Sequence, residues 1–302
     1  LRYSRSGAAF VAFSDYILGK GGVIYGAGYK GHFVVVHKRA TTREERDAFR
    51  GSKYVQSDMT GVFRNVKNDL KAGKLVLFSG TPCQTAGLKS YIGNQLSQNL
   101  ILIDIICHSV PAPQIWKDYL AYVERKCKSR VVSLEFRDKS IGWYQTYLES
   151  FKLANGKTYK DYKLRVFFYL GLGTRPSCEC CKFCNLSRPS DITIGDFWGY
   201  ERTVPEMNKD NKGISLVLCN TPKGREILRE ASVDLVFKKV PLEKALQLNL
   251  QHPSEGNPRK NEFAFDYEHK GFNYVVRKYG NGGIINKTRE FCRKVLREIV
   301  RL

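Results

Sequence analysis

The stretch Lys74-Leu-Val-Leu-Phe78, followed by Ser79-Gly-Thr-Pro-Cys-Gln84, decides the fold. Its first part is continuously apolar after Lys74, as in a strand that is buried on both faces of a parallel sheet. A second strand of this kind covers residues 99–106. Helical patterns follow the two strands, over about 85–91 after the first and from 113 to about 126 after the second. Strands joined through helices predict a parallel α/β layer. Because functional groups gather where such strands end, we expect Cys83 and Cys107 on one edge of the sheet.

Residues before this stretch extend the same layer. A helix is predicted over 6–19, with Ser6 as its cap, and strands over 23–28 and 32–38 with a glycine-rich turn between them. A short charged helix is predicted over 43–49 and a second helix over 58–71.

After the parallel α/β layer, the pattern of apolar residues in the sequence changes. Between 131 and 161, apolar and polar residues alternate in runs over 133–137, 147–153 and 157–160. This pattern predicts an antiparallel insertion with Asn155-Gly156 as a hairpin turn. A strand over 214–219 and a helix over 222–230 follow, and residues 288–302 form an amphipathic helix in this prediction. The expected fold is a mixed, largely parallel α/β sheet with flanking helices, the antiparallel insertion 131–161 and a cysteine-rich loop 175–200, in one domain spanning 1–302.

Four of the nine cysteines, Cys178, Cys180, Cys181 and Cys184, fall within seven residues. Two Cys-x-x-Cys steps share Cys181, a spacing that allows thiolates to meet at one metal centre. An iron–sulfur cube needs about four thiolates. The best set joins the two strand-end cysteines to one local pair: Cys83, Cys107, Cys178 and Cys181.

A zinc knot is the alternative. It uses Cys178, either Cys180 or Cys181, Cys184 and one remote ligand. The remaining thiols, Cys127, Cys219 and Cys292, lie in predicted helices or strands and are interpreted as inert.

The amino-acid composition indicates which partners and which cellular compartment suit the chain. The chain has 302 residues, with 50 Lys and Arg against 29 Asp and Glu, a formal charge of +21 that favours anionic partners. No run of about eighteen apolar residues predicts a membrane span. An odd number of cysteines fits a reducing compartment better than a disulfide framework, so the cytoplasm is expected. From Arg259 onward, eleven basic residues face five acidic ones, so the last helix is a candidate for docking an acidic protein or an anionic membrane.

Taken in order, several motifs resemble the coenzyme F420 (deazaflavin) hydrogenase/dehydrogenase beta-subunit family. They run over nearly the whole chain, although Cys107-His-Ser replaces a more usual Cys-His-Gly and the printed sequence has no N-terminal ferredoxin-like domain, which many members carry. The motifs are Ser6-Gly7, Gly51–Ser57, Gly80–Gln84, Cys107-His108, Phe136–Lys139, Arg175–Cys178 with Cys181–Phe183, and Asp191–Trp198.

The resemblance implies a flavoprotein with a [4Fe-4S] cluster that passes electrons between a ferredoxin-like protein and a deazaflavin or another small redox substrate. It favours the four cysteine ligands chosen above, FAD or FMN as the flavin, and coenzyme F420 as a candidate substrate. Lys53 and His108 are the predicted catalytic residues. His108 would shuttle a proton or stack near the flavin, and a structural role, with a hydrogen bond to a backbone carbonyl, is an equal alternative. The predicted flavin-binding residues are Ser6, Gly7, Gly51, Ser52, Lys53, Tyr54, Gln56, Gly80 and Thr81.

The sequence therefore predicts a flavin-dependent iron–sulfur oxidoreductase. Two alternatives stay open at this point. One is a zinc-stapled protein that binds nucleic acid or another polyanion through its positive charge, although no nucleic-acid module is recognisable and no such partner is expected. The other is an accessory protein of polysaccharide biosynthesis that keeps the fold without redox chemistry.

Overall fold

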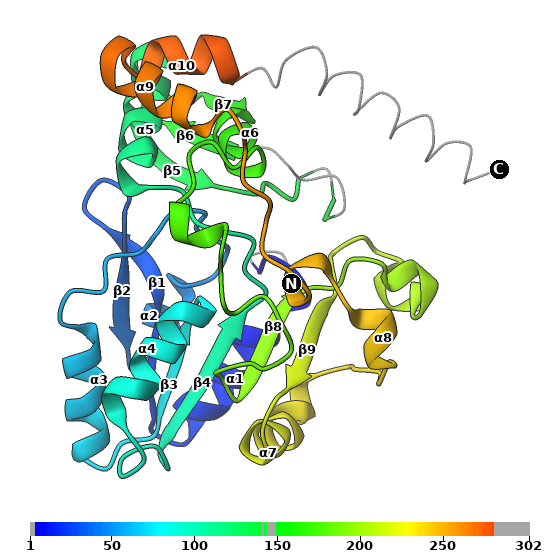
Figure 1. Cartoon of the computed structure of the whole chain (residues 1–302). Helices are drawn as coiled ribbons and strands as arrows, with labels where there is room; N and C mark the ends of the chain where they lie inside the picture. Colours follow the sequence, from blue (N-terminus) through cyan, green and yellow to red (C-terminus); the bar gives the residue numbers. More distant parts are fainter. Residues whose placement is uncertain (1–3, 141, 144–148, 281–302) are drawn as a thin grey trace.

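The structure, a computed structural model, describes residues 4–140, 142–143 and 149–280. A six-stranded sheet forms its lower half (Figure 1). The strands are β1 Val23–Lys30, β2 Val34–Ala40, β3 Val76–Gly80, β4 Leu100–Ile105, β8 Ile192–Asp196 and β9 Ser215–Cys219. They lie in the order β2-β1-β3-β4-β8-β9. The three inner pairings are parallel and the two outer ones antiparallel, which confirms the predicted mixed sheet.

Helices cover both faces of this sheet (Figure 1). Side chains alternate along β3, so Leu77 joins one apolar cluster while Val76 and Phe78 join the other. This two-sided burial explains the continuous apolar run of the strand. The helices on the Leu77 side are α1 Ala9–Gly19, α2 Arg43–Asp47 and α7 Pro222–Ala231, and those on the other side are α3 Val62–Lys71 and α4 Pro82–Ile92.

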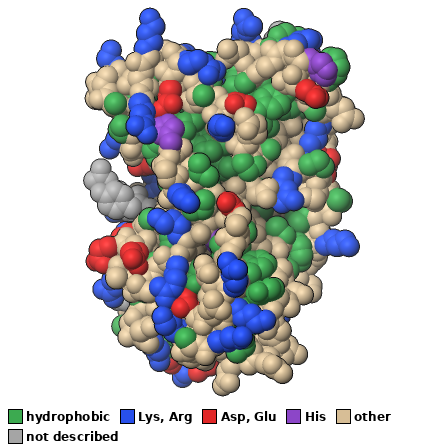
Figure 2. Space-filling view, turned by 90° about the vertical axis from the view of Figure 1, so that its left-hand side faces the viewer, with side chains coloured by type: hydrophobic (Ala, Val, Ile, Leu, Met, Phe, Trp, Pro, Cys, Tyr) green, Lys and Arg blue, Asp and Glu red, His purple; other side chains and the backbone are tan. Residues whose placement is uncertain are grey.

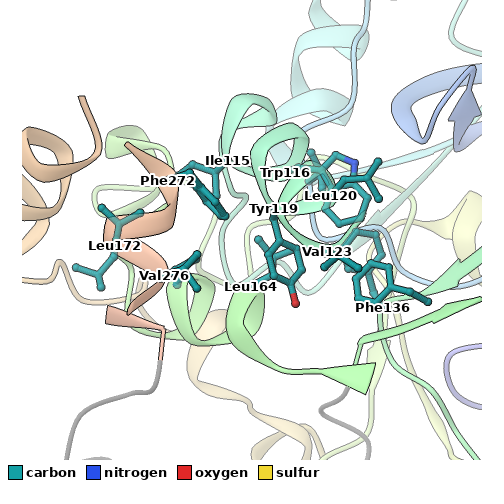
Figure 3. Packing of buried hydrophobic residues seen from close by; sticks show 14 of the residues in the cluster. Ile115, Trp116, Tyr119, Leu120, Val123, Phe136, Leu164, Leu172, Phe272 and Val276 are labelled. Carbon is teal, nitrogen blue, oxygen red and sulfur yellow. The ribbon is translucent and has the colours of Figure 1, made fainter. Parts of the chain in front are cut away.

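A second unit stands above the sheet (Figure 1). Its three strands, β5 Val131–Glu135, β6 Glu149–Leu153 and β7 Thr158–Asp161, pair antiparallel, as predicted for the insertion. Four helices pack on them around a largely aromatic cluster, part of which Figure 3 shows. These helices are α5 Pro113–Cys127, α6 Lys163–Tyr169, α9 Lys260–Lys270 and α10 Phe272–Tyr279. Of the four, the sequence predicted only α5.

Helix starts differ from the predictions. The first helix begins at Ala9 rather than Ser6, because Ala8 adopts a left-handed conformation with φ 64°. Ser6 caps nothing; its hydroxyl lies 3.1 Å from the Ser215 hydroxyl. Helix α4 begins earlier than predicted, at Pro82, since Thr81 and Gln84 form a reciprocal capping box.

Three predictions cannot be placed. The helix over 288–302 and Cys292 lie outside the described residues, and so do the first two residues of the strand predicted over 147–153. Within the described ranges, no helix is long and apolar enough to cross a bilayer. The short helix α8 Leu242–Ala245 completes the α-helices of these ranges.

Candidate functional site

The carboxyl ends of the parallel strands open onto one large cavity. In the sheet register, Gly80 at the end of β3 pairs with Asp104, and Ile105 at the end of β4 pairs with Ile194 of β8. The strands therefore deliver their following loops to one edge, where ligands bind in open α/β sheets. The cavity has a volume of about 710 Å³, which is within the range of small-molecule and cofactor sites.

Eight of the nine predicted flavin-binding residues line this cavity. They come from three segments that are far apart in the sequence: the N-terminus, the loop after Phe49 and the end of β3. The eight are Ser6, Gly51, Ser52, Lys53, Tyr54, Gln56, Gly80 and Thr81. The ninth, Gly7, lies behind the wall, where a Cβ would stand only 2.7 Å from the backbone nitrogen of Ser215.

The described lining is strongly cationic. Five basic side chains, Arg5, Arg50, Lys53, Arg137 and Arg175, face one carboxylate, Asp196. Such a lining suits an anionic ligand.

Asp196 organises two of these cations. Its carboxylate lies 2.9 Å from Arg5 and 3.7 Å from Arg137. Arg137 also donates to the Tyr54 hydroxyl at 3.0 Å, and its guanidinium carbon lies 5.6 Å from the ring centroid of Trp198. This ion-pair group holds the loop after β5, the loop after β8 and the N-terminal segment around one end of the cavity.

Lys53 stands at the cavity wall, but its ammonium group turns back to its own loop. It donates to the carbonyl oxygens of Ala48, Arg50 and Gly51 at 3.0, 3.0 and 3.2 Å. No carboxylate of the described residues pairs with it, so burial lowers its pKa to about 7. The group therefore changes charge near neutral pH.

A buried polar chain closes the floor of the cavity. Nε2 of His37 donates to the Ser79 carbonyl at 3.0 Å, and its Nδ1 therefore accepts from the Ser57 hydroxyl at 2.8 Å. Ser57 in turn accepts from the Gln84 amide at 2.9 Å. The His37 ring stacks on Phe78, and burial lowers its pKa to about 4. This chain joins β2, the 51–58 loop and α4.

His108 lines the cavity next to Cys107. Its Nδ1 lies 3.1 Å from both Asn249 Oδ1 and Ser254 Oγ, and its ring contacts Phe168 and Tyr169. Burial lowers the pKa of the imidazole. The ring is thus held in one orientation at the cavity wall, a placement compatible with proton transfer.

The predicted cysteine ligands gather around Cys107, next to His108. Cys83 and Cys107 line the cavity, while Cys178 and Cys181 lie in the adjoining loop. Burial raises the pKa of the Cys107 thiol, and the neighbouring thiols of Cys83, Cys178, Cys181 and Cys184 raise it further. The thiols that the sequence drew from three separate segments are therefore electrostatic neighbours.

The two remaining cysteines of the loop behave differently. Cys184 is buried and adjoins Cys181, which makes it a fifth candidate ligand that the predicted set left out. Cys180 is exposed, with its sulfur 3.8 Å from the Ser177 carbonyl.

A buried ion pair fixes the cysteine loop to the sheet. Arg188 and Asp104 meet at 2.9 Å with almost no solvent exposure. The same guanidinium donates to the carbonyl of Phe183, in the cysteine loop, at 2.6 Å and to that of Ile105, at the end of β4, at 3.1 Å. Arg188 therefore sets the distance between the loop and the strand that carries Cys107.

The thiols offer the donor chemistry of an iron–sulfur cluster. Among the described residues, no three Cys, His, Asp or Glu side chains lie close enough together to hold a single metal ion. Several thiols nevertheless surround Cys107 from three segments, and thiolates are the usual ligands of such clusters. The donor set fits a cluster in its chemistry, and the ligand assignment stays a prediction.

Sequence reasoning missed several residues of the cavity. Arg137 stood in a motif that carried the family resemblance, so its type and position were available as a signal. Asp196 stood in such a motif as well, Asp191–Trp198. His37 and Arg5 gave no comparable signal, because their roles depend on partners from other segments.

Comparisons with known proteins identify the family of this chain. The family model for the C-terminal part of the beta subunit of coenzyme F420 hydrogenase/dehydrogenase matches residues 73–245. The chain belongs to this family. It is thus an oxidoreductase relative of the F420 hydrogenase kind, as the sequence motifs indicated. No curated protein matches the chain.

The fold of this family member is also found in a solved structure. A chain of the F420-reducing [NiFe] hydrogenase complex from Methanosarcina barkeri, solved in a xenon-derivatised form, superposes with a TM-score of 0.52 at 17% sequence identity. The match covers 93% of this chain and 88% of the other. At this identity the likeness concerns the fold.

Proposed function

We propose that the protein is a flavin-dependent iron–sulfur oxidoreductase that passes electrons between a ferredoxin-like protein and a small redox substrate, with coenzyme F420 as a candidate. One observation carries the proposal: a single cavity of about 710 Å³ is lined by eight predicted flavin-binding residues together with Cys83, Cys107 and His108. A cofactor in this cavity would lie beside the thiols.

The residues of the site have separable tasks in this proposal. The cationic lining would hold the phosphates of FAD or FMN, and Cys83, Cys107, Cys178 and Cys181 would hold a [4Fe-4S] cluster, with Cys184 as a substitute ligand. A bound flavin would supply the exchange between one-electron and two-electron transfer. His108 would hold or release a proton at Nε2, since Nδ1 is engaged with Asn249 and Ser254.

The surface beside the cysteine loop supports an acidic protein partner. Arg175, Lys182 and Lys89 are exposed around the loop, and Cys83 itself is exposed. The only carboxylate within the loop sequence 175–188, Glu179, pairs with Lys260. Positive charge near the thiols would steer an acidic ferredoxin to the point of electron entry.

Polyanion binding has weaker support. Figure 2 shows lysine and arginine side chains spread over one face rather than gathered into a stripe along it.

The test is an anaerobic ultraviolet–visible spectrum with iron, sulfide and flavin analysis of the same sample. We expect iron with sulfide, and a flavin band that dithionite bleaches. Zinc without flavin would overturn the proposal and favour the zinc-stapled alternative. A colourless protein that takes up neither cofactor on reconstitution would favour the redox-inactive accessory protein.

A further inference from the structure

A smaller chamber adjoins the ligand cavity beside the antiparallel sheet. Its volume of about 20 Å³ is enough for one water molecule. It shares Tyr54, Arg137, Phe168 and Tyr169 with the lining of the large cavity. The remaining walls are Phe136, Glu149, Leu164 and Arg165. The two spaces are therefore separated only by side chains that belong to both.

Glu149 is the acidic group of this chamber. The residue is 3% exposed, and none of the described residues donates a hydrogen bond to its Oε2. An ionised carboxylate is costly to bury with an unsatisfied oxygen, whereas the neutral acid has its own proton to donate. A water in the chamber would give Oε2 the missing partner.

Charges around Glu149 also favour its neutral form. Asp161 lies directly opposite it on β7 and already engages Lys163 at 2.9 Å and the Tyr159 hydroxyl at 2.8 Å. The pKa of Glu149 is raised well above its usual range, chiefly by burial and then by the Asp161 charge. The backbone of Glu149 itself, and the charge and backbone of Arg165 of α6, act in the opposite direction and lower the pKa by a smaller amount.

The other titratable groups near this carboxyl are tyrosines and one further cation. The buried Tyr119 of α5 interacts electrostatically with both Glu149 and Asp161. Tyr54, Tyr169 and Arg137 stand between the chamber and the cavity. Hydroxyl groups at this boundary are suited to passing a proton.

We propose that Glu149 is held as a neutral carboxylic acid and donates its proton, through a water in the chamber, to an acceptor that is reduced in the ligand cavity. This inference rests on the proposed function. An acceptor that gains a hydride, two electrons and one proton, needs a second proton to become neutral. The Glu149 O–H bond breaks and the chamber water relays the proton to the acceptor. The carboxylate then regains a proton from solvent that enters the open cavity.

The first experiment tests protonation without any cofactor. The infrared difference spectrum between the wild-type protein and Glu149→Gln at pH 7 should contain the carbonyl-stretching band of a protonated carboxyl group. Glu135→Gln, at an exposed position of the neighbouring strand β5, is the matched control. The difference spectrum between the wild-type protein and this variant should lack the band. Absence of the band from the wild-type difference spectrum would overturn the proposal whether or not the protein binds a flavin.

The second experiment tests proton delivery in the reconstituted protein, with dithionite as electron donor and coenzyme F420 as the two-electron acceptor. Glu149→Gln should slow F420 reduction by about 10²-fold or more, the usual size of a general-acid contribution, and should remove its solvent deuterium isotope effect. Glu149→Asp, which keeps an acid, should recover part of the rate. Reduction of the cluster by dithionite alone takes up no proton from Glu149 and should keep its rate.

These results separate the two proposals. A protein that binds neither iron nor flavin refutes the proposed function, and with it the relay, even where the infrared band is present. A loaded protein in which Glu149→Gln reduces F420 at the wild-type rate, with the same pH profile and isotope effect, refutes the relay alone.

Discussion

The two sheets of this protein are stabilised in different ways. At the carboxyl edge of the six-stranded sheet, buried polar groups such as His37 and the Asp104–Arg188 pair make directional contacts. The three-stranded unit instead buries an aromatic cluster that includes Tyr119, Phe151 and Phe167. Directional bonds fix the positions of loops, whereas apolar burial stabilises roughly in proportion to area. The first region therefore sets the geometry of the site, and the second supplies a stable wall over it.

The two regions meet at the cavity. Arg137, which follows β5, and Phe168 and Tyr169, at the end of α6, are contributed to its lining by the second unit. A ligand in the cavity would therefore contact both. The following changes, ordered from the largest expected effect to the smallest, test whether their roles are as different as the contacts suggest.

Truncation of the aromatic core should have the largest effect on stability. Phe151 is fully buried on β6, and Phe151→Ala should lower the free energy of unfolding by about 3–5 kcal/mol, because a large cavity is left. Urea unfolding measures the loss. Phe151→Leu is the matched control with a smaller loss. Equal losses for the two variants would show that packing in this unit is less tight than the structure indicates.

Breaking the buried ion pair should cost slightly less. Arg188→Met leaves Asp104 without its partner and should destabilise by about 3–4 kcal/mol. Burial already raises the pKa of Asp104, so protonation limits the cost. In addition, the cysteine loop should loosen, so that thiol reagents modify Cys184 faster. Lys212→Met, which removes an exposed pair with Asp210, is the control and should change stability by less than about 1 kcal/mol. Unchanged reactivity of the Cys184 thiol in Arg188→Met would contradict the conclusion that Arg188 holds the cysteine loop against the sheet.

Acid should weaken the sheet edge through His37. Its pKa is about 4 in the folded protein and about 6.5 when unfolded. The unfolded chain therefore binds more protons between these values, and stability falls as the pH drops from 6.5 towards 4, by about 3 kcal/mol in total. Unfolding measured across this range in the wild type and in His37→Gln isolates the contribution. The same pH slope in both proteins would exclude His37 as the cause.

Lys53 should have a smaller, pH-dependent effect on flavin binding. With a pKa of about 7, its ammonium group is charged below neutrality and neutral above it. Attraction of the flavin phosphate should therefore weaken as the pH rises through 7, raising Kd by about tenfold at most. Fluorescence titration of FAD at pH 6 and pH 8.5 measures this change. Lys53→Arg stays charged and should flatten the dependence; a dependence that persists in this variant would assign it to another group.

Substitution of Cys180 in the cysteine loop should give the smallest effect, in contrast with substitution of Cys107 at the end of β4. Cys180→Ser should leave iron content unchanged, because Cys180 is exposed and turned to Ser177. Cys107→Ser should abolish iron binding after reconstitution, since its thiol lies among the four others. Loss of iron in Cys180→Ser would favour a metal site formed within the cysteine loop, as in the zinc-knot alternative.

Much of the six-stranded sheet could be predicted because the signals were local. The apolar run 74–78 and the strand 99–106 identified two central strands, and their ends placed Cys83 and Cys107 on one edge. The helices α6, α9 and α10 were not predicted. Their apolar residues face an aromatic cluster formed with α5 and the antiparallel sheet, so they depend on partners distant in sequence.

The sequence by itself determined the fold class, most of the cysteines near Cys107 and most of the loops that line the cavity, because residue type and chain direction are enough to bring strand ends together. Only the tertiary structure showed that His37, Arg5 and Asp196 line the cavity and that Glu149 lies beside a water-sized chamber. It also showed that Arg188 joins the cysteine loop to the sheet. The physical reason is that burial and charge pairing depend on residues brought together from distant segments. Those contacts exist only in the folded chain.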